Sequence, residues 1–90
     1  MNEKKGGDTI PEVGDVVIYF DHSGMPHNAV ITAVWGPEVY PAPEDAPSLN
    51  LVYVSTDESK SDPFGRQIER DTSVPHRSQQ KAHGNYWEEP

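Results

Sequence analysis

Five polar residues in the last third of the chain have the side chains needed to bind a carboxylate or a phosphate. They are Arg66, Arg70, Thr72, His76 and Arg77. Guanidinium groups form charge-assisted hydrogen bonds with such anions, and the hydroxyl and imidazole groups add further hydrogen-bonding capacity. No Lys or Arg lies between Lys5 and Lys60, whereas nine acidic residues do. This uneven distribution of charge predicts a binding surface in the last third of the chain.

Arg70 has two interpretations. Because side chains alternate along a strand, a strand over residues 67–74 has two faces. One face carries Ile68, Arg70, Thr72 and Val74, and the other carries Gln67, Glu69, Asp71 and Ser73. Beside Ile68 and Val74, the guanidinium of Arg70 either forms an ion pair with an internal carboxylate, which is the simpler interpretation, or emerges at a rim where it meets a partner.

No catalytic residue, metal site or cofactor is predicted. Ser73 and His76 are separated by Pro75, and this spacing gives no particular reason to expect a nucleophile beside its base. The chain contains four histidines, namely His22, His27, His76 and His83. Their spacings lack the neighbouring carboxylates or thiols that are typical of a zinc site. We therefore expect a protein that is not an enzyme.

Length and charge narrow the classes of function further. The chain has 90 residues, a formal net charge of −8 and no cysteine, so it forms one domain at most and no disulfide. A domain of this size buries a small core, and we expect a homo-oligomer or a place in a larger assembly. The net charge opposes direct binding to nucleic acid or to an anionic membrane. No secretion signal or apolar run of about 20 residues is visible, which predicts a soluble protein made in the cytoplasm.

The arrangement of β-branched and aromatic residues predicts an all-β fold. Such residues concentrate in short runs bounded by Gly and Pro, and no run has a helical repeat. The predicted strands span residues 15–20, 28–35, 49–55, 67–74 and 85–87. Residues 1–10 are predicted to be a flexible arm, and residues 11–88 a single domain. The expected fold is a small five-stranded antiparallel SH3-like barrel with little helix.

The loop and the aromatic residues complete the predicted barrel. Residues 36–47 contain four prolines, so we expect them to form a long loop that protrudes from the sheet.

Aromatic side chains dominate the cores of small domains. The residues predicted to pack in the core or close the barrel are Trp35, Tyr53, Tyr86 and Trp87.

Several motifs, taken in order, resemble small bacteriophage proteins with an SH3-like β-barrel. The resemblance covers residues 11–88, and its sharpest element is Val-Pro-His at 74–76 followed by His-Gly-Asn-Tyr-Trp at 83–87. The earlier elements are Val-Gly-Asp at 13–15 and the strands at 28–35 and 49–54. The loop at 36–47 looks like an insertion relative to the shortest members. The resemblance implies a phage origin and a barrel fold, and no site residue is taken from it.

Three functions are compatible with these features. The first is a non-enzymatic virion component that decorates a capsid, neck or tail surface, with a phage structural protein as its partner and the virion as its location. The second is a counter-defence protein that sequesters a host nucleotide signal or a host enzyme, with Arg66 and Arg70 contacting phosphates. The third is an acidic DNA mimic, which is weaker because the acidic residues form no even stripe in the sequence. We expect the first.

Overall fold

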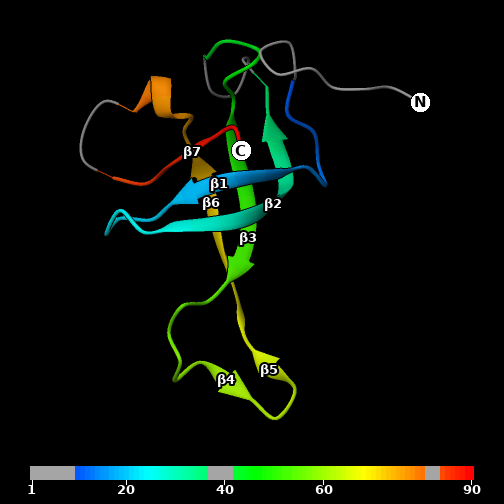
Figure 1. Ribbon diagram of the computed structural model, residues 1–90. Coiled ribbons are helices and arrows are strands. Elements are labelled where there is room, and N and C mark those ends of the chain that lie inside the picture. The colour runs from blue at the N-terminus through cyan, green and yellow to red at the C-terminus, as the bar shows by residue number, and fades with distance from the viewer. Residues whose placement is uncertain (1–9, 37–41, 81–83) are drawn as a thin grey trace.

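The computed structural model describes residues 10–36, 42–80 and 84–90, which form an almost entirely β structure (Figure 1). Its strands are β1 (Val16–Phe20), β2 (Pro26–Trp35), β3 (Ser48–Val54), β4 (Ser61–Asp62), β5 (Gly65–Arg66), β6 (Ile68–Val74) and β7 (Tyr86–Glu88). Among the described residues, one 3-10 turn, η1 (Arg77–Gln79), precedes β7. The predicted arm at residues 1–10 lies, except for Ile10, outside the described residues.

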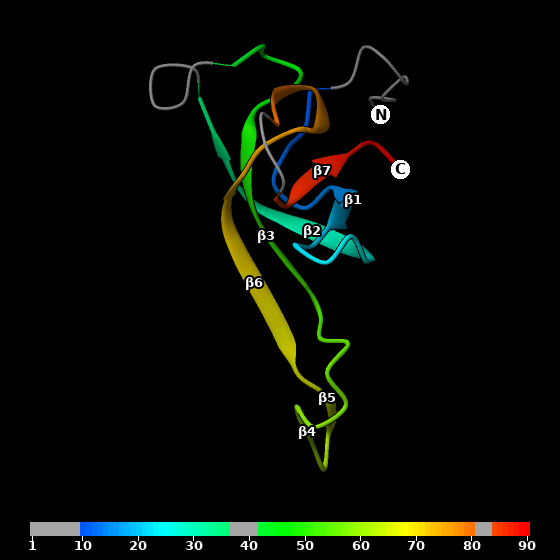
Figure 2. The same ribbon diagram turned by 90° about the vertical axis from the view of Figure 1, so that its left-hand side faces the viewer.

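Five strands form one antiparallel sheet in the order β6-β3-β2-β1-β7, which curls into a half-barrel (Figures 1 and 2). The two ends of the sheet approach each other where His76 forms a bridge with Trp87. There the amide of Trp87 donates a hydrogen bond of 3.0 Å to the carbonyl oxygen of Pro75. The prediction of an all-β fold is confirmed, and the curled sheet is consistent with a small SH3-like barrel.

The turn between β1 and β2 is held by the side chain of Asp21. One carboxylate oxygen of Asp21 accepts hydrogen bonds from the amide and the hydroxyl of Ser23 and from the amide of Met25. Gly24 has a φ of 86°, a left-handed conformation that glycine adopts without steric cost. The turn chemistry that predicted this hairpin is therefore present in the structure.

Two irregularities of the ladder change which side chains face the interior. The pairing of β2 with β3 shifts between Ile31 and Ala33, so Val34 packs against the core in place of Ala33 and Trp35. The pairing of β3 with β6 shifts where Asn50 lies opposite two residues, 72 and 73. Such bulges insert one unpaired residue and reverse the alternation beyond it.

The second bulge changes which residues of β6 share a face of the sheet. Val74 is buried on the same side as Glu69 and Asp71, whereas Arg70 is exposed on the opposite side. Ser73 adopts a φ of 54° at the bulge, and its amide donates to the side-chain oxygen of Asn50 at 2.9 Å. The prediction that Arg70 and Val74 share a face was wrong, because it assumed uninterrupted alternation.

The core lies inside the curl of the sheet. It consists of Val17, Tyr19, Ala29, Ile31, Leu49, Leu51, Val74 and Trp87, with Val34 and Tyr53 packed against it. Trp87 is buried and its indole nitrogen donates to the carbonyl oxygen of Pro47 at 2.9 Å. Trp35 and Tyr86 do not belong to the core cluster: both are only half-buried, and Tyr86 stacks on Phe20.

The end of the predicted loop belongs to the packed domain. Residues 37–41 lie outside the described residues, but Ala46 and Pro47 are buried. Since Pro47 also accepts the hydrogen bond from Trp87, the expectation that residues 36–47 protrude as a whole is wrong at its last two positions.

A small second hairpin, formed by β4 and β5, projects beyond the end of the main sheet (Figures 1 and 2). Its turn is stabilised by the amide of Phe64, which donates to the carboxylate of Asp62 at 2.8 Å. The side chain of Phe64 is 96% exposed. The sequence predicted the turn at residues 62–65 but not the two short strands.

Candidate functional site

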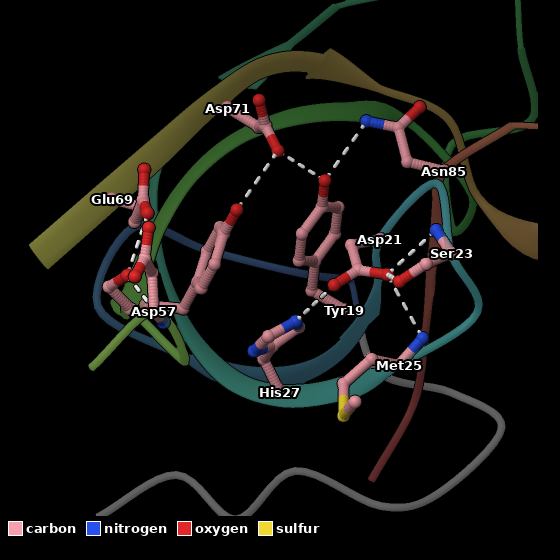
Figure 3. Close-up of polar contacts among 11 residues, drawn as sticks. Tyr19, Asp21, Ser23, Met25, His27, Asp57, Glu69, Asp71 and Asn85 are labelled. Atoms are coloured by element: carbon pink, nitrogen blue, oxygen red, sulfur yellow. Dashed lines mark hydrogen bonds and ion pairs between the residues drawn. The ribbon is translucent and has the colours of Figure 1, made fainter. Parts of the chain in front are cut away.

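A network of polar side chains joins strands that are distant in the sequence across the interior of the sheet (Figure 3). The hydroxyl of Tyr19 donates to the carboxylate of Asp71. The hydroxyl of Tyr53 lies 3.5 Å from the same carboxylate oxygen, and the amide nitrogen of Asn85 donates to the hydroxyl oxygen of Tyr19 at 3.2 Å. The carboxylate of Asp71 therefore accepts from residues of β1 and β3 while belonging to β6.

Both tyrosines of this network hold their protons more tightly than a free tyrosine does. Burial raises the pKa of Tyr19 well above its ordinary value, and the hydrogen bond to the negatively charged Asp71 raises it further. Burial and the charge of Asp71 also raise the pKa of Tyr53. At neutral pH the two hydroxyl groups therefore act as hydrogen-bond donors rather than as bases or nucleophiles.

His27 and Asp21 form a second polar contact on the inner side. The Nε2 atom of the buried His27 lies 2.8 Å from a carboxylate oxygen of Asp21. The ring of His27 packs on Tyr53, with the ring centroids 4.5 Å apart. Burial alone would raise the pKa of Asp21, but hydrogen bonds from His27, Ser23 and Met25 outweigh it and hold that pKa well below its usual range.

A third group of polar contacts lies where β3 leads toward the projecting hairpin. The hydroxyl of Ser55 donates to the carboxylate of Glu69 at 2.7 Å, and the Nζ atom of Lys60 lies 3.1 Å from the same oxygen. The hydrogen bonds from Ser55 and Lys60 lower the pKa of Glu69. Glu69 and Asp71, which the sequence analysis did not select as site residues, thus provide the inward carboxylates of β6.

The interior network is saturated with internal hydrogen bonds. In the described ranges, every buried side-chain nitrogen or oxygen has a hydrogen-bond partner. The interior groups bind each other and stabilise the curl of the sheet.

Neither a metal cluster nor a membrane-spanning helix is found among the described residues. No group of three or more histidine or acidic side chains in them is placed to hold a metal ion, and His83 lies outside them. None of the described helical segments has the length and hydrophobicity of a membrane-spanning helix.

A hollow of about 290 Å³ lies between the β1–β2 turn and the residues before β7. Its lining includes Asp21, His22, Ser23, Gln80 and Tyr86. Both carboxylate oxygens of Asp21 are already occupied by the contacts of the turn and by His27. The strongest polar group of the hollow is therefore committed to the fold.

The structure separates the five predicted site residues into two groups. His76 and Arg77 are engaged with the end of the chain: the Nε2 atom of His76 lies 3.0 Å from Glu89, and a guanidinium nitrogen of Arg77 lies 3.0 Å from Glu88. Burial would raise the pKa of Glu89, but the hydrogen bond with His76 lowers it. These contacts fasten η1 to the segment that begins with β7.

The other three predicted residues lie along β5 and β6 and are exposed. A guanidinium nitrogen of Arg66 donates to the backbone carbonyl oxygen of Ser55 at 2.9 Å. Arg70 forms no hydrogen bond or ion pair with any residue of the described chain, and Thr72 lies in the bulge. The ion pair expected between Arg70 and an internal carboxylate is therefore not formed, because the neighbouring carboxylates point to the opposite face.

Arg70 ends a row of apolar side chains on the outward face of the sheet, which we call the outer-face row. Directly paired positions connect Val16 to Val30, Val30 to Val52, and Val52 to Arg70. Val16 and Val30 are exposed although they are large and apolar. Side chains at directly opposed positions project on the same face and contact each other. The outer-face row therefore crosses four strands.

A second apolar pair extends the same surface toward the projecting hairpin. Val54 and Ile68 are directly opposed on β3 and β6, and their side chains are 58% and 68% exposed. Sequence reasoning missed these residues because outward and inward valines look alike in strands rich in β-branched residues. The signal was present in the alternation of Val52 and Val54 with the core residue Leu51.

The fold and this surface define a small antiparallel β-barrel module. Its interior polar side chains are hydrogen-bonded to one another, and its outer face carries a row of apolar side chains that ends at Arg70. Comparison with protein-family models, with curated proteins and with solved structures finds no match for this chain.

Proposed function

We propose that this chain is a non-enzymatic bacteriophage virion component that docks on a capsid, neck or tail protein through its outer face. The observation that carries the proposal is the outer-face row, Val16, Val30, Val52 and Arg70, together with Val54 and Ile68 beside it. The phage origin comes from the resemblance of the sequence motifs.

The outer-face row has the properties of a docking surface. Burial of an exposed valine or isoleucine side chain stabilises a complex by about 1.5–3 kcal/mol when burial is complete. An apolar surface beside a charged guanidinium matches the composition of interfaces, where arginine is enriched. Among the described residues, Arg70 has no internal partner to lose when it binds.

The polar groups of the interior support a binding function rather than a chemical one. Asp71, Tyr19 and Tyr53 hold one another, and their raised tyrosine pKa values keep the hydroxyls protonated. A domain of 90 residues has a small core, so docking on a larger protein also adds stability that the isolated domain lacks.

Mass spectrometry of purified virions tests this function. We expect the chain in stoichiometric amounts in particles of the phage that encodes it. We also expect Val30→Lys, which places a charge in the centre of the outer-face row, to reduce its incorporation. His22→Lys is the matched control, because it places the same charge on the exposed β1–β2 turn away from the row.

Two outcomes would overturn the proposal. One is a chain that is abundant in infected cells and missing from the virions. The other is equal incorporation of the Val30→Lys and wild-type chains, given that both are folded by circular dichroism.

A further inference from the structure

The strand β6 has an open edge along which another strand can pair. In the sheet order β6-β3-β2-β1-β7, β6 has a single neighbour, β3, and Figure 2 shows β6 at the edge of the sheet. At the opposite end of the sheet, the amide of Trp87 in β7 is occupied by the carbonyl of Pro75. The longer open edge of the described sheet is therefore that of β6.

The hydrogen-bond pattern identifies which backbone groups of β6 are free. The amide of Ser55 donates to the carbonyl oxygen of Gln67, so Gln67 directs that oxygen toward β3. In an antiparallel ladder this direction alternates, which turns Glu69 and Asp71 toward β3 and Ile68 and Arg70 away from it. The N–H and C=O groups of Ile68 and Arg70 therefore point to the open side.

A second copy of this chain is a poor occupant of the edge. An antiparallel pair of β6 strands centred on Glu69 or on Asp71 places two identical carboxylates directly opposite each other. A pair centred on Arg70 opposes two guanidinium groups, and one centred on Ile68 opposes Arg66 to Arg70. Like charges at directly opposed positions destabilise a sheet, so each of these four registers is disfavoured.

The charge at the edge selects a different occupant. Arg70 projects on the outer face without an internal partner in the described chain, and a carboxylate at the directly opposed position of an added strand would contact it. The neighbouring outward position is Ile68, which is apolar and 68% exposed. In the added strand, the residue two positions from this Asp or Glu lies opposite Ile68 and should therefore be apolar. The overall charge of −8 would repel an acidic partner, but it is screened beyond about 8 Å at physiological salt. The local contact with Arg70 therefore decides the preference for an acidic residue in the added strand.

We propose that β6 binds an extended segment of a foreign protein by strand addition, and that this segment carries Asp or Glu opposite Arg70 and an apolar residue opposite Ile68. The inference rests on the proposed docking function and adds the backbone mode of binding and the chemistry of the partner. The added strand pairs with the free groups of Ile68 and Arg70, and it continues the apolar outer face by one strand.

A library of extended octapeptides, randomised at four alternate positions and selected on the intact chain, tests the inference. We expect enrichment of Asp or Glu at one randomised position and of an apolar residue two positions away. The selected peptide should slow amide hydrogen exchange at Ile68 and Arg70, and the Arg70→Glu variant should bind it about tenfold more weakly because attraction becomes repulsion. The same library selected on Arg70→Glu should yield Lys or Arg at the opposed position.

A backbone variant separates strand addition from a contact made only by side chains. Ile68→Pro removes an amide that points away from β3, so the internal ladder keeps its hydrogen bonds while the added strand loses one. We expect at least tenfold weaker binding of the selected peptide. If this variant does not fold, the exchange rates of the wild-type amides and the Arg70→Glu selection decide the question.

Three results would overturn the inference: no selected peptides, enrichment of basic residues on the wild-type chain, or protection of amides elsewhere than at β6. These measurements do not depend on the virion. Absence of the chain from particles would therefore reject the proposed function, whereas failure of the peptide selection would reject strand addition alone.

Discussion

The hydroxyl of Tyr19 in β1 donates a hydrogen bond to the carboxylate of Asp71 in β6, 52 residues later in the chain. The two strands are not neighbours in the sheet order, so this bond crosses the interior of the curl. Tyr53 of β3 adds a second donor, and Asn85 donates to Tyr19 from the segment before β7. Four segments are thus connected through two side chains.

Removal of the charge of Asp71 should lower the pKa of Tyr19. Burial still raises that pKa in Asp71→Asn, but the charged hydrogen bond that raises it further is lost. We expect the alkaline absorbance titration of tyrosine to begin at lower pH in the variant. Asp45→Asn, at an exposed loop carboxylate, is the control. An unchanged titration would show that Asp71 does not interact with the hydroxyl in solution.

The same shift predicts a loss of stability at high pH. The folded-state pKa of Tyr19 is raised above its ordinary value of 10.0, so its contribution is complete below pH 10.0 and is lost as the pH rises through the folded-state value. We expect the free energy of unfolding, measured with urea, to fall as the pH rises above 10.0. The Tyr19→Phe variant should show a smaller fall, and an equal fall in both proteins would refute the assignment.

Asp21 should have the opposite pH dependence. Its pKa is lowered below the ordinary value of 3.8, so its stabilising contribution is present above that pH and is lost as the pH falls through the folded-state value. We expect Asp21→Asn to be less stable than wild type at neutral pH and to lose less stability on acidification. Melting temperatures measured from neutral to acidic pH test this, with Asp45→Asn as the control; parallel curves for the two proteins would contradict it.

The two tryptophans should differ in their importance for stability. Trp87 is buried in the core and donates to Pro47, so Trp87→Ala should cost about 3–5 kcal/mol and largely unfold the domain. Trp87→Phe retains part of the volume and keeps the comparison measurable if the alanine variant is unfolded. Trp35 is half-buried on the outer side, so Trp35→Phe should cost less than Trp87→Phe in urea denaturation. The reverse order would place Trp35 in the core.

Ser73 carries a strained backbone at the bulge of β6. Its φ of 54° is disfavoured for residues with a Cβ atom and costs about 1 kcal/mol, more for β-branched residues. We expect Ser73→Val to lower the free energy of unfolding by about 1–2 kcal/mol, whereas Ser73→Gly should leave it unchanged or raise it. Thr72→Val is the matched control at the neighbouring exposed position. If Ser73→Gly were the more destabilised variant, the bulge would lie elsewhere.

The sequence predicted the strands well because local composition determines them. Runs of valine, isoleucine and tyrosine between Gly and Pro residues predicted β1, β2 and β3, and the shorter segments at 67–74 and 85–87 were also predicted to be strands. The turn of residues 21–25 formed where its Asp and Gly indicated. The binding residues were predicted less well. Charge patterning selected Arg66, Arg70 and Arg77 together, but only Arg70 lacks a partner among the described residues, since Ser55 and Glu88 bind the other two.

By itself the sequence determined an all-β chain with most of its basic residues in the last third, because strand propensity, turn chemistry and charge are properties of neighbouring residues. Only the tertiary structure decided which side chains face inward. Each of two bulges shifts the alternation by one position, and for this reason Val34 replaces Trp35 at the core and Val74 joins Asp71 on the inner face. A bulge depends on how a strand pairs with its neighbour, and that pairing involves residues distant in the sequence. The exposure of Arg70 and the enclosure of Asp71 both follow from it.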